Sequence, residues 1–332
     1  MMRATDQGAS AQPEMLARSG RVTEAVAALT RAIATGDAAA AYTFGNWRMT
    51  GDLIRRDLGA ARELFARASA LGLAEAEPVY LALLANGAGG SGRQWLAALD
   101  RLRQRAASDP LARQQSALLD RMALNADGDP ATPAIGETLS EAPRLTRFPA
   151  FLTAEECAYV IRRAEPLLEP SVVVHPSTGQ LVRDPIRTSQ AAAFPFIRED
   201  PVFHAINRRI AAATGTTYEQ GEPVQVLSYE PDQEYKLHSD ALPPGANQRV
   251  MTFLVYLNDR YQGGETFFPT GEITVRGQPG DALLFHNVDS AGRPDADARH
   301  AGLPVRKGRK LLLSKWIRSA PLDLRGPPGR PF

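Results

Sequence analysis

The first third of the chain repeats a pattern of small and large apolar residues. A small–large–small run followed by glycine occurs twice, 36 positions apart, at Ala25, Leu29, Ala32 and Gly36 and again at Ala61, Phe65, Ala68 and Gly72. Up to about Met122 the chain is rich in Ala, Leu and Arg, which favours helices. A period in the mid-thirties is typical of stacked helical hairpins, in which glycines end the helices. We therefore expect an α-helical, solenoid-like repeat domain over residues 1–124, with a plain Ala-rich helical bundle as the alternative.

One part of this region has a family resemblance. The stretch from Asp57 to Gly89, DLGAARELFARASALGLAEAEPVYLALLANGAG, resembles a Sel-one-like repeat, a relative of the tetratricopeptide repeat. Members of that family form solenoids that often bind proteins. The resemblance therefore implies that the first domain binds a protein partner.

The composition changes after residue 124. Residues 125–143, NADGDPATPAIGETLSEAP, have the Pro, Gly, Asp and Thr content of a linker. Beyond Glu222, short apolar runs (PVQVLSY, VMTFLVYL, EITV, DALLF and KLLLSKWI) are separated by Gly and Pro, as in an antiparallel sandwich or barrel. We expect an α+β domain over residues 144–319 and an irregular tail over residues 320–332.

Two helices are expected ahead of the strands. Thr153 and Glu156 form a capping-box pattern that predicts a helix near residues 154–168. Asp200 followed by Pro201 predicts the start of a second helix.

Charge and cysteine content exclude several classes of protein. The chain has 38 Lys+Arg against 37 Asp+Glu, a formal net charge of +1, so a nucleic-acid-binding protein is not expected. Its single cysteine, Cys157, cannot form an internal disulfide or a thiolate metal site. No apolar run approaches the roughly 20 residues needed to cross a bilayer, and the first residues lack the apolar core of a secretory signal. We expect a soluble, cytoplasmic protein without a membrane partner.

Two histidines and one aspartate form the pattern of a metal site. His238 and Asp240 lie two positions apart in H-S-D, and His300 follows sixty residues after Asp240. Residues i and i+2 of a strand project from the same face, so His238 and Asp240 can bind one ion together, with a third ligand from a distant strand. Two imidazoles and one carboxylate are the ligands of non-haem Fe(II) oxygenases. The H-x-D pattern alone is a weak signal, and the motifs around it carry the assignment.

Lys310 begins the apolar strand KLLLSKWI ten residues after His300. A lysine in such a place normally extends to solvent, but beside a metal site it can pair with the far carboxylate of a dicarboxylate cosubstrate. The segments LSYEPDQEYKLHSD, QRVMTFLVYLNDRYQGGETFFP, GDALLFHN and RHAGLPVRKGRKLLLSKWI resemble the 2-oxoglutarate- and Fe(II)-dependent prolyl 4-hydroxylase family. The resemblance covers roughly residues 145–319.

The resemblance implies a fold and a reaction. The fold is a double-stranded β-helix, or jelly-roll, core with flanking helices. The reaction is hydroxylation of prolyl residues in a peptide or protein, with 2-oxoglutarate converted to succinate and carbon dioxide. It requires Fe(II), 2-oxoglutarate and O2, with L-ascorbate as the reductant.

The resemblance also implies roles for individual residues. His238, Asp240 and His300 match the iron ligands. The residues that match the 2-oxoglutarate pocket are Lys310, which binds the distal carboxylate, and Tyr229, Thr266 and Trp316 around it. Positions of the peptide groove are matched by Arg187, Ser189, Glu222, Tyr235 and Arg249, each of which is equally well explained as a surface or supporting residue. Residues 170–185 fall where the family has a mobile loop over the substrate.

Two other functions stay open. The same chemistry can act on a free amino acid or small metabolite. Alternatively, the helical repeats can make the chain an adaptor with an inactive oxygenase domain. A helical domain that delivers a protein substrate to the catalytic barrel combines both activities.

Overall fold

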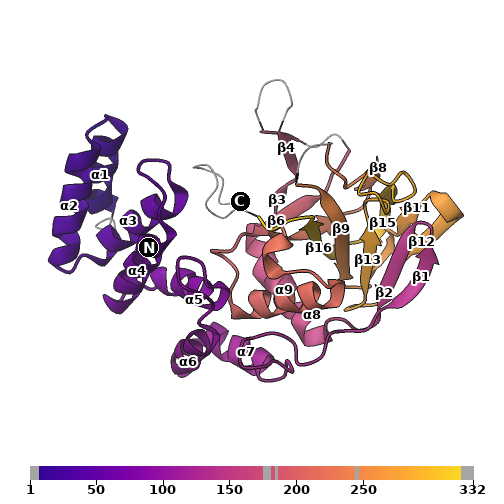
Figure 1. Ribbon diagram of the computed structural model, residues 1–332, viewed down its shortest axis with the longest axis horizontal. Coiled ribbons are helices and arrows are strands. Elements are labelled where there is room, and N and C mark those ends of the chain that lie inside the picture. Colours follow the sequence, from indigo (N-terminus) through magenta and orange to yellow (C-terminus); the bar gives the residue numbers. More distant parts are fainter. Residues whose placement is uncertain (1–6, 175–180, 184–185, 244–246, 323–332) are drawn as a thin grey trace. The chain divides into compact units, whose positions relative to one another are not determined.

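The computed structural model describes residues 7–174, 181–183, 186–243 and 247–322 (Figure 1). These residues divide into two compact units. The helical unit contains residues 7–129 and 195–205, and the sheet unit contains residues 130–194 and 206–322. No helix within the described ranges is both long enough and apolar enough to cross a membrane.

The helical unit is a chain of short helices in which each contacts the next. In order they are α1 (Gln7–Arg18), α2 (Val22–Ala34), α3 (Ala38–Thr50), α4 (Leu58–Ala70), α5 (Ala76–Asn86), α6 (Trp95–Arg105) and α7 (Pro110–Leu119). Helices α2 and α4 begin 36 residues apart, which is the spacing of the sequence pattern. The matching apolar positions are buried, as shown by Leu29 and Phe65, which are each 1% exposed.

The glycines of the pattern end these helices. Gly36 and Gly72 have φ angles of +93° and +91°, a conformation that glycine adopts without strain. After each glycine, the next backbone N–H bonds back into the helix, from Asp37 to Ala32 and from Leu73 to Ala68. Both helices therefore have the same C-terminal cap.

The sheet unit contains two facing antiparallel sheets. The larger has the order β1 (Glu137–Glu141), β2 (Arg144–Phe148), β13 (Ala282–His286), β9 (Arg249–Tyr256), β16 (Lys310–Arg318), β7 (Val224–Tyr229), β6 (Gln190–Phe194) and β3 (Glu169–Pro170). The smaller has the order β12 (Ile273–Val275), β11 (Thr266–Phe268), β14 (His300–Gly302) and β8 (Tyr235–His238). The remaining pairs are β10 (Tyr261–Gly263) with β15 (Val305–Gly308), and β4 (Val172–Val174) with β5 (Leu181–Arg183).

A single apolar core joins the two sheets. It combines residues of β7, β9, β13 and β16 with Phe268 of β11, and Tyr256, Phe268 and Phe285 are each at most 1% exposed. Several neighbouring strands are distant in the sequence, such as β2 and β13 in the larger sheet and β8 and β14 in the smaller. The expected α+β class with a jelly-roll core is confirmed.

Strand β16 shows how the larger sheet separates its two faces. Lys310 and Trp316 line a pocket on the inner face, whereas Lys315 on the outer face donates a hydrogen bond of 2.6 Å to Asn207 Oδ1 of α9 (Pro201–Thr214). Helix α8 (Ala154–Ala164) begins with the expected Thr153 capping box. It is joined to α9 by the ion pair of Glu156 with Arg209, at 2.8 Å.

Two segments differ from expectation or lie outside the described residues. Strand β1 occupies the end of the predicted 125–143 linker, because its backbone groups pair with β2 in an antiparallel hairpin. Within the expected substrate loop, residues 175–180 and 184–185 lie outside the described residues, as does most of the predicted tail, residues 323–332.

Candidate active site

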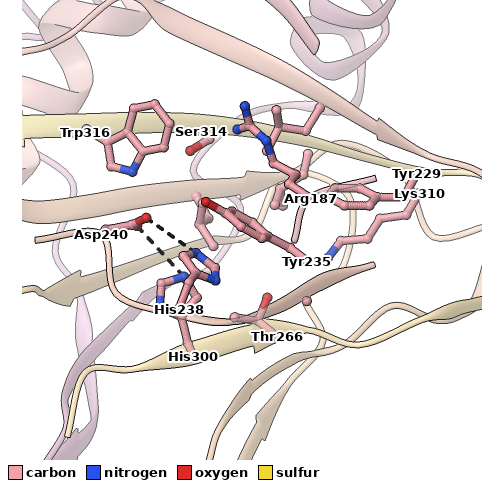
Figure 2. Close-up of a pocket in the computed structure, with 14 residues that line it drawn as sticks. Arg187, Tyr229, Tyr235, His238, Asp240, Thr266, His300, Lys310, Ser314 and Trp316 are labelled. Atoms are coloured by element: carbon pink, nitrogen blue, oxygen red, sulfur yellow. Dashed lines mark ion pairs between the residues drawn. The ribbon is translucent and has the colours of Figure 1, made fainter. Parts of the chain in front are cut away.

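A pocket opens between the two sheets of the sheet unit, and both sheets supply its walls (Figure 2). Its lining residues are Arg187, Leu227, Tyr229, Tyr235, His238, Asp240, Leu254, Thr266, His300, Gly302, Lys310, Leu312, Ser314 and Trp316. Most of the residues singled out from the sequence are therefore in one place, although they come from strands that are far apart along the chain.

His238, Asp240 and His300 form a compact buried cluster at this pocket. Asp240 Oδ1 lies 3.5 Å from His238 Nε2, and Asp240 Oδ2 lies 3.8 Å from His300 Nε2 (Figure 2). The three ligand atoms all lie within 4.8 Å of one another. Strand pairing brings the histidines together, because His300 of β14 is directly opposite His238 of β8.

The backbone orients both imidazole rings. His238 Nδ1 lies 2.8 Å from the carbonyl oxygen of Lys236, and His300 Nδ1 lies 3.1 Å from that of Ala298. A carbonyl can only accept, so each Nδ1 carries the proton and each Nε2 has a free lone pair. Within the described chain, the buried Nε2 of His238 has no hydrogen-bond partner. These donor atoms fit a divalent metal ion.

Charge state also favours metal binding. Burial would raise the pKa of Asp240, but His238, His300 and a hydrogen bond from Thr252 together lower it below its ordinary value. Burial lowers the pKa of His300 to about 4, so its imidazole is neutral at pH 7. The cluster therefore presents the neutral imidazole of His300 and the carboxylate of Asp240 beside the Nε2 of His238.

Two residues that were not predicted from the sequence hold Asp240. Thr252 Oγ1 donates to Asp240 Oδ2 at 2.7 Å, and Asn287 Nδ2 donates to the same hydroxyl at 2.9 Å. All three side chains are buried. Carboxylate ligands are commonly fixed by such outer partners, which tune metal affinity.

Lys310 provides a buried cation at the same pocket. Its side chain is 3% exposed, and Nζ donates a hydrogen bond of 2.6 Å to the carbonyl oxygen of Gly264. Nζ lies 5.5 Å and 5.8 Å from the ring centroids of Tyr229 and Tyr256. Burial lowers the pKa of Lys310 to about 8, and the lysine is still mainly protonated at neutral pH. This end of the pocket is therefore suited to an anion.

Tyr229 and Thr266 lie in the pocket as well. Tyr229 is directly opposite Lys310 in the pairing of β7 with β16. Thr266 Oγ1 lies 3.0 Å from the hydroxyl of Tyr256, a residue of β9 that sequence reasoning did not select. The two sheets thus place hydroxyl-bearing side chains around the ammonium group.

Trp316 occupies the other end of the pocket. It stands six residues after Lys310 on β16, which corresponds to about 20 Å along a strand. Figure 2 accordingly shows Trp316 beside Asp240, with Lys310 on the opposite side of Tyr235. Trp316 therefore lines the same pocket as Lys310, at the end away from the ammonium group.

The predicted peptide-groove residues fall into three groups. Tyr235 and Arg187 line the pocket: the Tyr235 ring stacks on His238 with centroids 3.4 Å apart, and the Arg187 guanidinium lies 5.5 Å from the Tyr235 ring. Ser189 lines a neighbouring pocket that also includes Arg187. Glu222 and Arg249 line neither pocket, and they form a bidentate ion pair with each other at 2.6 Å and 2.9 Å.

Strand periodicity could have identified further lining residues. Leu312 and Ser314 fall between Lys310 and Trp316 at alternate positions, so they share the inner face of β16. Leu227 and Leu254 line the pocket from β7 and β9. Thr252 and Asn287 carry no comparable signal, since their contact with Asp240 depends on how distant segments meet.

Comparison with known proteins identifies relatives of this architecture. Residues 224–318 match the model of the 2OG-Fe(II) oxygenase superfamily. Prolyl 4-hydroxylase 1 of Arabidopsis thaliana is 38% identical over 201 residues, covering 55% of this chain and 71% of the relative. Probable prolyl 4-hydroxylase 10 of the same plant is 35% identical, with 55% and 71% covered. Among solved structures, the viral collagen prolyl hydroxylase of Paramecium Bursaria Chlorella virus-1 in complex with 2OG aligns with 28% identity and a TM-score of 0.43, covering 53% of this chain and 96% of that one.

Proposed function

Because the chain belongs to the prolyl 4-hydroxylase family of 2OG-Fe(II) oxygenases, we propose that it hydroxylates prolyl residues in a peptide or protein, releasing succinate and carbon dioxide from 2-oxoglutarate. One observation carries the proposal for this chain. The cluster of two histidines and one aspartate opens into the same pocket as a buried lysine. Metal and dicarboxylate binding are thereby available within one cavity.

His238, Asp240 and His300 would hold Fe(II). The unpartnered Nε2 of His238 and the two carboxylate oxygens of Asp240 support this role. Iron bound with 2-oxoglutarate and O2 supplies the oxidising power that transfers one oxygen atom to a C–H bond. With three protein ligands, further coordination positions of the metal would be available to the cosubstrates.

Lys310 would bind the distal carboxylate of 2-oxoglutarate. A bound carboxylate compensates for the cost of burying the ammonium group and stabilises its charged form. Tyr229 and Thr266 would support the same carboxylate from the two sheets. These assignments explain why Lys310 is 3% exposed although, among the described residues, its ammonium group bonds to a backbone carbonyl and not to a carboxylate.

The peptide would enter over Tyr235, Arg187 and Trp316, with Ser189 in the adjoining pocket. Large aromatic side chains and a guanidinium provide the flat apolar and cationic surfaces that favour peptide binding. Arg249 and Glu222 would act from behind Trp316, because they pair with each other and line neither pocket.

The helical unit would recruit a protein substrate, which agrees with the resemblance of residues 57–89 to a protein-binding repeat. Removing residues up to about Ala126 should then reduce turnover of a protein substrate more than turnover of a short peptide. The proposal includes L-ascorbate as the reductant. It also includes a cytoplasmic location for the protein.

The decisive experiment supplies the full chain with Fe(II), 2-oxoglutarate, O2 and proline-containing peptides. We expect succinate together with a peptide mass gain of about 16 Da, the mass of one oxygen atom. His238→Ala should abolish both products while leaving protein binding by the helical unit intact. A protein that neither binds nor converts 2-oxoglutarate would contradict the proposal, and oxidation of free amino acids but no peptide would change its substrate.

A further inference from the structure

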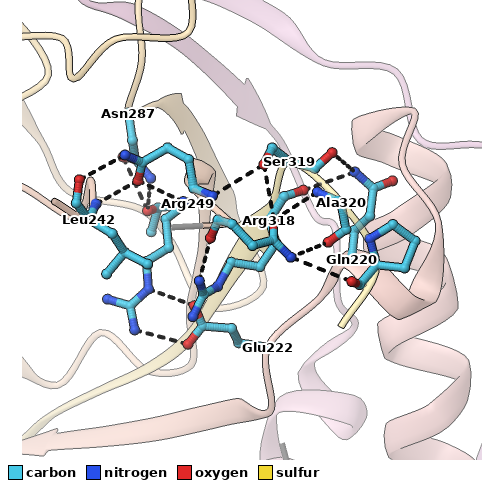
Figure 3. Close-up of polar contacts among 12 residues, drawn as sticks. Gln220, Glu222, Leu242, Arg249, Asn287, Arg318, Ser319 and Ala320 are labelled. Atoms are coloured by element: carbon cyan, nitrogen blue, oxygen red, sulfur yellow. Dashed lines mark hydrogen bonds and ion pairs between the residues drawn. The ribbon is translucent and has the colours of Figure 1, made fainter. Parts of the chain in front are cut away.

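Two arginines share one carboxylate behind Trp316. Glu222 Oε1 accepts from Arg249 Nε at 2.6 Å and from Arg318 Nε at 2.5 Å, and its Oε2 accepts from Arg249 Nη2 at 2.9 Å (Figure 3). Arg318 also donates to the carbonyl oxygen of Asn247 at 2.5 Å. Arg249 and Arg318, which share the carboxylate of Glu222, are called the arginine pair below.

The single carboxylate of Glu222 does not balance the two positive charges of the arginine pair. Guanidinium groups stay protonated at any physiological pH, so two positive charges face one negative charge. In the portion of the chain described by the structure, no second carboxylate forms an ion pair with Arg249 or Arg318. Their side chains are 21% and 17% exposed, which leaves the surplus charge only partly hydrated.

The surplus charge lies next to the active-site wall. The Arg249 guanidinium carbon is 3.8 Å from the centroid of the Trp316 ring, close enough for a cation–π contact. Trp316 lines the pocket, and among the described residues its buried indole N–H has no acceptor. Trp316 therefore offers an unused donor at the end of the pocket away from Lys310, with the positive charge of Arg249 against its ring.

Neither group is needed for the cosubstrate. The proposed function assigns one end of 2-oxoglutarate to the metal cluster and the other to Lys310. Trp316 is about 20 Å along β16 from that lysine. An anion that this positive charge attracts to the Trp316 end of the pocket would therefore belong to the molecule that is oxidised.

We propose that the arginine pair and the Trp316 N–H select a carboxylate on the substrate, namely an Asp or Glu side chain within a few residues of the target proline. The proposal rests on the proposed function, because it names the substrate class of the same site. The α-carboxylate of a free amino acid has the same chemistry, and the test distinguishes the two sources.

The test measures binding and turnover with matched peptides. Each peptide has one proline and carries Glu, Gln or Lys at one position within three residues of it. For the full chain loaded with metal and 2-oxoglutarate, we expect the best-placed Glu peptide to bind about five- to tenfold more tightly than its Gln counterpart, as for a partly buried charge pair. Lys should bind more weakly than Gln, and the differences should shrink at high salt.

Two substitutions at one position provide the matched control. Arg318→Gln removes the surplus charge while Arg249 keeps its bond to Glu222, so the preference for Glu over Gln should fall to less than about twofold. Arg318→Lys keeps the charge and should keep the preference. The second arm of the test compares free proline with prolinamide. If the wild type prefers the acid over the amide and Arg318→Gln does not, the ligand is an α-carboxylate. That result would overturn the assignment to a peptide side chain.

Binding is read directly by fluorescence anisotropy, so the inference does not depend on turnover. Equal affinity for Glu and Gln peptides at every position, or a preference that persists in Arg318→Gln, would overturn it. Charge-selective binding without hydroxylation would support the inference while contradicting the proposed function. Hydroxylation of the peptides without a preference for Glu would support the proposed function while contradicting the inference.

Discussion

Replacing Lys310 with Met should make the ligand-free protein more stable and remove its affinity for 2-oxoglutarate. The lysine is 3% exposed, and within the described residues its ammonium group donates a hydrogen bond to the carbonyl of Gly264. Methionine has a similar length and no charge, so the substitution removes the buried ammonium without opening a large cavity.

The magnitude follows from the pKa of Lys310, which burial lowers from 10.5 to about 8. Below pH 8 the lysine is charged in both the folded and the unfolded protein, and the folded state therefore carries the full free-energy cost of burying the ammonium group. This shift corresponds to about 3 kcal/mol of lost stability at pH 7. Subtracting about 1 kcal/mol for the hydrogen bond to Gly264 leaves an expected gain of about 2 kcal/mol for Lys310→Met.

The pH dependence gives a second signature. As the pH rises from 8 to 10.5, the unfolded wild-type chain binds more protons than the folded one, so the free energy of unfolding should increase. Lys310→Met should lack this increase, so the two proteins should be equally stable near pH 10, and above that pH the wild type should be the more stable by about the 1 kcal/mol of its hydrogen bond to Gly264. Urea unfolding of the ligand-free proteins at a series of pH values measures both effects.

Binding of 2-oxoglutarate should respond in the opposite direction. Loss of the buried cation should weaken binding by at least about 30-fold, as for removal of one partner of a buried charge pair. Lys315→Met is the matched control on the same strand, because Lys315 faces away from the pocket and bonds to Asn207. That variant should bind 2-oxoglutarate normally. Unchanged binding by Lys310→Met, or lower stability than the wild type at pH 7, would refute the reasoning.

Three further outcomes are expected. Thr252→Val should lower the affinity for Co(II) by about tenfold or more in calorimetric titration, because Asp240 loses its hydrogen-bond donor, whereas Thr252→Ser should not. Above pH 8, affinity for 2-oxoglutarate should fall by up to tenfold per pH unit as Lys310 loses its proton, and a monocarboxylate analogue measured in parallel should show no such fall. Gly264→Ala should cost more stability in thermal unfolding than Gly292→Ala: both have positive φ, but only at Gly264 would a Cβ meet neighbouring side chains, at 3.0–3.2 Å. Equal losses at the two glycines would mean that backbone strain alone decides.

Much of the site was predictable because the chemistry is tied to short local patterns. His238 and Asp240 project together from the end of one strand. The role of Lys310 came from the family resemblance, because a lysine at the start of an apolar strand normally extends to solvent. The helix caps at Gly36 and Gly72 were equally local, since a helix that ends in the left-handed conformation favours glycine.

Contacts between distant segments could not be predicted from the sequence. The role of Arg249 in the peptide groove stays a prediction, and only the pairing of β9 with β16 shows that its guanidinium lies against Trp316 and Glu222. Trp316 lines the same pocket as Lys310, and only the tertiary structure shows at which end of that pocket it lies. Thr252 could not be selected at all, because its role comes only from contact with Asp240.

The sequence by itself determined the residue types, their strand periodicity and the division into a helical and a strand-rich region. These follow from local geometry, in which a side chain's direction depends on its immediate neighbours along the chain. Only the tertiary structure decided which charges are compensated. The balance between Glu222 and its two arginines, and the burial of Lys310, arise where strands distant in the sequence pair in one register, and electrostatic energy depends on those distances in space.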